Sequence, residues 1–286
     1  MIHFFEAVMQ YGFLQKALIT SVMVGIISGV IGCFIILRGM ALMGDAISHA
    51  VLPGVAISFM LGINFFIGAV ITGILTAIGI GFINQNSRVK NDSAIGIMFT
   101  AAFASGIILI TFLKSSTDLY HILFGNVLAV RPSDMWITLI VGIFVLLSVF
   151  IFYKELLVSS FDPIMAQAYG LPTKMIHYFL MVLLTLVTVA SLQTVGIILV
   201  VAMLITPAST AYLLSDRLSV MIFISAICGT ISAVIGLYLS FTYNLASGAT
   251  IVLVATALFF IAFIFSPKQG LLWRAIRTNK QKSALS

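Results

Sequence analysis

Nine long apolar runs constrain the fold of this chain more than any other feature of its sequence. As helices, each could cross the roughly 30 Å hydrocarbon core of a bilayer. They occupy residues 17–37, 40–61, 65–84, 94–113, 135–153, 175–192, 194–213, 218–240 and 248–266. Only 8% of the residues are charged, against about 25% in soluble domains. The sequence therefore predicts an all-α, polytopic membrane helix bundle with about nine transmembrane helices.

Two boundaries between these runs depend on few residues, at Arg38-Gly39 and at Gln193-Thr194, so the number of spans lies between eight and ten. The short loops leave room for one single transmembrane domain over residues 1–286, with a mobile tail at about 268–286. The first 16 residues lack the basic start and small-residue cleavage site of a signal peptide. We expect this N-terminal stretch to be retained, and it could form an interfacial helix.

The basic residues predict the orientation of the spans. With nine alternating spans and a cytoplasmic C-terminus, eleven Lys and Arg residues face the cytoplasm and three face outward. The inner set is Arg38, Arg88, Lys90, Lys154, Lys174, Arg217, Lys268, Arg274, Arg277, Lys280 and Lys282, and the outer set is Lys16, Lys114 and Arg131. This bias follows the positive-inside rule of bacterial plasma or inner membranes. It also explains the net charge of +6 without a nucleic-acid partner.

Small residues at helical spacing indicate close helix packing. Gly25 and Gly29 form a GxxxG pair, and a second row consists of Ala69, Gly73, Ala77 and Gly81. Such rows let helix backbones approach closely in lipid. The two cysteines, Cys33 and Cys228, lie inside apolar runs, so neither a disulfide nor a thiolate metal site is expected.

Asp45 is the acidic residue that lies inside an apolar run, and His49 follows four positions later. Residues i and i+4 share one face of a helix, so a carboxylate and an imidazole are presented together. In lipid an aspartate near the helix centre costs about 2.5–3.5 kcal/mol. The pair should therefore face a polar cavity or a partner helix, and Pro53-Gly54 can bend or interrupt the helix beyond it.

Three interpretations of this pair are open. It could be a structural hydrogen-bonded pair, a proton relay, or a stopping point for a metal ion. Imidazole nitrogen and carboxylate oxygen suit manganese, zinc or iron(II). Two ligands are too few to hold a metal, but two copies of the chain across a two-fold axis would supply four. The third interpretation thus predicts a homodimer.

A second signal lies in the loop between the fifth and sixth runs. Asp162-Pro163 is a helix-start pattern, because Asp accepts hydrogen bonds from free backbone N–H groups and Pro suits the first turn. Gly170 and Pro172 predict the end of a short helix. Since the charge distribution puts this loop in the cytoplasm, the helix could contact a soluble partner, although an ordinary interhelical loop would look similar.

Four segments together resemble the permease subunits of metal-specific ABC importers, and particularly their manganese branch. They are ILRGMALMGDAISHAVLPGVAISF, KSSTDLYHILFGNVLAV (114–130), SSFDPIMAQAYGLP (159–172) and SLQTVGIILVVAMLITPASTAYLL (191–214). The resemblance extends over nearly the whole chain. It implies an importer of a divalent transition metal, with manganese favoured over zinc or iron.

The resemblance also implies roles for residues and partners. Asp45 and His49 match the family's intramembrane pair that contacts the metal in transit. A segment at about 161–171 matches its ATPase-coupling helix, through Phe161, Asp162, Pro163, Ala166, Ala168 and Gly170. The implied partners are a second copy of the chain, a dimer of ABC ATPase subunits in the cytoplasm, and an extracellular metal-binding lipoprotein.

Four further residues are weaker candidates for the entrance or gate of the path. Asp118 and His121 lie in the outer loop 114–134, where a solvated histidine is an equally good interpretation. Gln193 and Pro207 lie at the two ends of a stretch that could line or gate the path, but such residues are common in membrane helices.

Missing motifs limit the remaining alternatives. Without GxxxxGK[ST] the chain cannot itself hydrolyse ATP, and it has no HExxH or GxSxG, so it is not expected to be an enzyme or to hold a catalytic cofactor. ATP would act only through the partner subunit. The alternative function is a proton-coupled secondary transporter with Asp45-His49 as its relay, which inverted repeats would favour. A passive channel would need a filter or ring of charge.

Overall fold

The computed structural model describes residues 2–112, 127–266 and 270. All the long elements of this part of the chain are helices. The N-terminal half contains α1 (Ile2–Gln10), α2 (Gly12–Leu37), α3 (Leu42–Ala50), α4 (Leu52–Leu61), α5 (Phe65–Asn86) and α6 (Asn91–Phe112). The short 3-10 turn η1 (Val127–Ala129) precedes α8 (Pro132–Ile151), α9 (Tyr153–Phe161), α10 (Pro163–Ala168), α11 (Thr173–Val195), α12 (Ile197–Leu214), α13 (Leu218–Tyr243) and α14 (Ser247–Phe265).

Nine segments of the described residues are long and apolar enough to span a membrane. They coincide with the nine predicted runs, and α3 and α4 together make up the second span, Leu42–Leu61. The predicted all-α membrane bundle is therefore confirmed. The predicted tail at about 268–286 lies outside the described residues, apart from Gly270.

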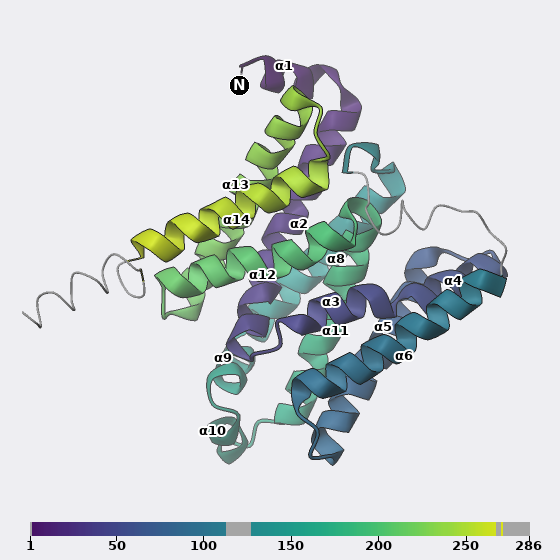
Figure 1. The fold of residues 1–286 in the computed structure, drawn as a ribbon. Coiled ribbons are helices and arrows are strands. Elements are labelled where there is room, and N and C mark those ends of the chain that lie inside the picture. Colours follow the sequence, from purple (N-terminus) through teal and green to yellow (C-terminus); the bar gives the residue numbers. More distant parts are fainter. Residues whose placement is uncertain (1, 113–126, 267–269, 271–286) are drawn as a thin grey trace, which may run out of the picture.

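Helix α2 lies at the centre of the bundle and contacts α8, α11, α12 and α13 (Figure 1). The GxxxG pair makes its closest contact with α13. A Cβ added to Gly25 would come within 2.8 Å of the backbone of Gly229, and Ser225 donates a hydrogen bond of 2.9 Å to the carbonyl of Gly29. The predicted small-residue packing is present, because only glycine lets these two backbones approach so closely.

Helices α3 to α6 form a second group that packs against α2 through α11 and α12 (Figure 1). The row of small residues on α5 faces α11, where Gly73 lies against Thr185 and Gly81 against Tyr178. On its other side α5 meets α4, with Gly54 against the backbone of Gly68. These contacts hold the second span, and so Asp45 and His49, in a fixed place between α5, α6, α11 and α12.

Two breaks interrupt the helices, one within the second span, where Pro53-Gly54 predicts it, and one between the spans α11 and α12. Helix α3 ends before Val51, and Pro53 stands in the first turn of α4, because proline cannot donate the hydrogen bond that would continue the helix. Between α11 and α12 the break falls at Gly196, beyond the predicted Gln193-Thr194 boundary. Gly196 has φ of 82°, a conformation that side chains disfavour.

Gly54→Ala should destabilise the bundle, because the new Cβ would collide with the backbone carbonyl of Gly68. Overpacking of this kind costs about 1–3 kcal/mol. The thermal stability of the purified protein in detergent measures the effect. Gly96→Ala is the matched control, since a Cβ there meets nothing within 4 Å. Equal stability of the two variants would contradict the close α4–α5 contact.

Candidate metal-binding pair and docking helix

Helix α3 carries Asp45 and His49 on one face, as their spacing predicts. The Oδ1 atom of Asp45 lies 3.6 Å from Nε2 of His49, which is too long for a hydrogen bond. The side chain of Asp45 is 47% exposed and that of His49 is 24% exposed. In the single chain both groups therefore remain accessible to a third partner.

The imidazole of His49 is held by aromatic rings from α6. Phe99 and Phe103 each meet it edge to face, with ring centroids 5.5 Å away. These rings fix the plane of the imidazole without using its nitrogens. The Nδ1 atom is buried and has no hydrogen-bond partner among the described residues. A buried nitrogen left without a partner is costly unless another group binds it.

This geometry fits a ligand pair better than a structural hydrogen bond. Neither imidazole nitrogen makes a hydrogen bond to the carboxylate, and together the two side chains offer one nitrogen and two oxygens. In the described part of the chain, no group of three or more His, Cys, Asp or Glu could hold a metal ion. A transition metal at the pair would need ligands from water or from another chain.

Helix α10 begins as Asp162-Pro163 predicts. The Asp162 carboxylate accepts hydrogen bonds from the backbone N–H groups of Ile164 (3.0 Å) and Met165 (2.9 Å). At the other end, Gly170 has φ of 77°, which suits a glycine just after a helix. The result is a helix of six residues that projects from one end of the bundle (Figure 1).

The surface of α10 and its flanks is unusually apolar for an exposed loop. Phe161 is 54% exposed, Ile164 81% and Tyr169 69%. Met165 is also exposed, whereas Ala166 is fully buried and anchors the helix. Large apolar side chains clustered on a projecting element are typical of surfaces that contact another protein or a membrane. We call Phe161, Ile164, Met165 and Tyr169 the docking face.

Two of the weaker candidates lie in helices that contact α3. Gln193 is half-buried in the last turn of α11, and Pro207 is buried within α12. Asp118 and His121 lie outside the described residues, so their place is not defined. Ala168, at the end of α10, and Gly170, just beyond it, are exposed.

Sequence reasoning missed three kinds of residue at these sites. Phe99 and Phe103 are four apart on α6, a pattern that also describes ordinary membrane helices. Ile164 and Met165 are apolar, so the sequence predicts that they are buried, and only the structure shows that they are exposed on α10. Arg38 marks a span boundary and the orientation in the sequence, which does not indicate that its side chain bonds to α9 and α11.

Comparison with known proteins gives a consistent result. The model of the ABC 3 transport family matches residues 10–266. The chain is 73% identical to the manganese transport system membrane protein MntC of Listeria innocua, over 94% of this chain and 96% of that protein. It is 55% identical to the manganese import system permease protein ScaB of Streptococcus gordonii, with coverage of 96% and 99%.

A solved structure agrees with these relatives. PsaBC from Streptococcus pneumoniae, in complex with Fab, superposes with a TM-score of 0.85 at 56% identity, covering 94% of this chain and 98% of that chain. The match in sequence and in fold extends over both the α3 pair and the α10 segment, since it covers almost the whole length. This chain belongs to the ABC 3 transport family.

Proposed function

We propose that this chain is the membrane-spanning subunit of an ATP-driven importer that moves manganese into a bacterial cell. The observation that carries the proposal is the Asp45-His49 pair, whose Oδ1 and Nε2 atoms lie 3.6 Å apart on one face of α3, with both side chains partly exposed. Manganese is preferred to zinc or iron because relatives at 73% and 55% identity are named for manganese transport. A nitrogen and carboxylate ligand set accepts all three metals.

In the complete transporter, two copies of the chain would face each other across a two-fold axis. The exposed carboxylate of Asp45 and the imidazole of His49 from each copy would then supply four ligands to one ion. They would replace part of its water shell as it crosses the membrane. The cost of keeping these side chains in the bilayer would be offset by the passing dication.

The docking face would receive the ATPase subunit. The chain has no nucleotide-binding motif, so ATP would be bound and hydrolysed by that separate partner. Because α10 and Arg88, Lys90, Lys154 and Lys174 belong to inward-facing loops under the charge rule, this end and the C-terminus would be cytoplasmic. An extracellular metal-binding lipoprotein would deliver the ion on the opposite side.

ATP-driven closure of two ATPase subunits would move both copies of α10 and so change the access to the pair. This movement would be a rigid-body switch between two conformations, in which the binding of ATP to the ATPase subunits favours one conformation over the other. The short capped helix suits the task, because Asp162 fixes its first turn and buried Ala166 holds it to the bundle.

Cell-associated metal measures the proposed function directly. Cells that lack this protein should accumulate less manganese than cells that carry it, with smaller or no differences in zinc and iron. An ATPase subunit should co-purify with the chain. If only the zinc content of the cells falls, the transported metal is zinc and not manganese. If the manganese, zinc and iron contents are all unchanged, the proposal is contradicted.

A further inference from the structure

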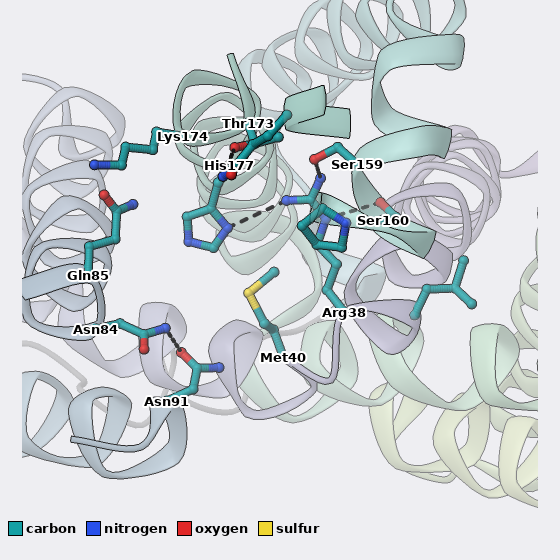
Figure 2. A pocket seen from close by; sticks show the side chains of 13 residues that line it. Arg38, Met40, Asn84, Gln85, Asn91, Ser159, Ser160, Thr173, Lys174 and His177 are labelled. Atoms are coloured by element: carbon teal, nitrogen blue, oxygen red, sulfur yellow. Dashed lines mark hydrogen bonds between the residues drawn. The ribbon is translucent and has the colours of Figure 1, made fainter. Parts of the chain in front are cut away.

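A cavity of about 580 Å³, lined mostly by residues with polar side chains, lies at the end of the bundle that carries α10. The ends of α2, α5 and α9 and the starts of α6, α10 and α11 surround it (Figure 2). Its charged lining residues are Arg38 and Lys174, and no aspartate or glutamate lines it. The cavity therefore has a positive electrostatic potential.

Arg38 is unusual because it is half-buried and its bonding partners are uncharged. Its Nε donates to Oγ of Ser160 and its Nη2 donates to Oγ of Ser159, each at 3.0 Å. Its Nη1 lies 3.4 Å from Nδ1 of His177. A guanidinium has donors only, so His177 must accept here and its ring is neutral. Burial lowers the pKa of Arg38 to about 10, so it remains charged at neutral pH.

None of these three bonds pairs Arg38 with a carboxylate. Its three bonds use three of its five N–H groups, and two remain available. A half-buried cation with neutral partners is normally paired or bound to an anion. The planar guanidinium matches the oxygens of phosphate and carboxylate groups particularly well.

Other donors surround the same cavity. Lys174 and Gln85 lie across the cavity from Arg38 (Figure 2). Helix α11, of 23 residues, begins at Thr173 without a side-chain cap. The N–H of Thr173 is bonded to the carbonyl of Leu171, and the positive end of the helix dipole adds to the field. Asp92 is exposed near the start of α6 and does not line the cavity.

We propose that this cavity is a binding site for a phosphate group, held by Arg38 and Lys174 between the docking helix and the membrane helices. Basic pockets between transmembrane helices suit anionic lipid headgroups, and a free phosphate has the same chemistry. Pro163 and Gln167 of α10 also line the cavity, so a bound phosphate would connect α10 to the end of α2 and the start of α11. The site does not depend on the proposed transport of metal.

The test uses the full-length protein purified in an uncharged detergent, and its readout is the thermal unfolding midpoint. One arm titrates inorganic phosphate against chloride at equal ionic strength. A second arm adds phosphatidylglycerol or phosphatidylcholine. Both are repeated with Arg38→Met and Lys174→Met, with Arg88→Met and Lys154→Met as controls, because Arg88 and Lys154 are exposed and do not line the cavity.

We expect phosphate or phosphatidylglycerol to raise the unfolding midpoint in a saturable way. Arg38→Met should lower the apparent affinity for the stabilising ligand about tenfold or more, since hydrogen bonds to charged groups are the strong ones. Lys174→Met should weaken it several-fold, and this variant serves if Arg38→Met does not fold. Stabilisation by inorganic phosphate identifies a soluble source, and stabilisation by phosphatidylglycerol alone identifies a lipid. No saturable effect, an equal effect in the controls, or an effect that requires the ATPase subunit would overturn the proposal.

Discussion

Asp45→Asn and His49→Ala should each reduce manganese accumulation to the level of cells without the transporter. Asparagine keeps the shape of Asp45 but removes the charge that attracts a dication, and alanine removes the only imidazole on that face of α3. Loss of groups that merely support metal ligands costs about 10–100-fold in metal affinity or activity, so loss of a ligand should cost at least as much. Uptake of radioactive manganese measures the effect.

The control for this prediction is Asp92→Asn, which removes an exposed carboxylate at the start of α6 and should leave uptake unchanged. Both site variants should still assemble, as judged by their amount in the membrane and by co-purification of the ATPase subunit. Wild-type uptake in both would refute the metal role of the pair. If uptake instead collapses on adding a protonophore while cellular ATP is maintained, the pair is a proton relay in a secondary transporter.

Ile164→Asp should detach the ATPase subunit and thereby abolish transport. Ile164 is 81% exposed at the centre of the docking face, where an interface would bury it and an added carboxylate would be desolvated without a partner. Losing an apolar anchor at an interface costs about 2 kcal/mol or more, equivalent to about 30-fold in affinity. Co-purification of the two subunits and the ATPase activity of the complex measure the loss.

Leu245→Asp is the matched control for the docking face. Leu245 is 52% exposed and lies between α13 and α14, at the end of the bundle opposite α10 (Figure 1). The same apolar-to-acidic change there should leave the ATPase bound. If both variants lose it equally, the effect is general destabilisation and α10 is not the docking helix.

Much of the fold of this protein can be predicted from its sequence, because a lipid bilayer permits few backbone conformations. A backbone in hydrocarbon must satisfy its own hydrogen bonds, so a long apolar run has few alternatives to a helix, and all nine predicted spans are present. The start of α10 was equally predictable, because Asp162 and Pro163 act on the backbone next to them. The i, i+4 spacing likewise put Asp45 and His49 on one face.

Only the tertiary structure decided the contacts between segments that are distant in sequence. The periodicity of α6 does not predict which of its rings contact the imidazole of His49. In the structure these are Phe99 and Phe103, and the Nδ1 atom of His49 has no hydrogen-bond partner among the described residues. Arg38 reads as an ordinary positive-inside residue, and its enclosure by Ser159, Ser160 and His177 depends on how α2, α9 and α11 pack. Local sequence determines local hydrogen bonding, whereas the neighbours of a side chain depend on the packing of the whole chain.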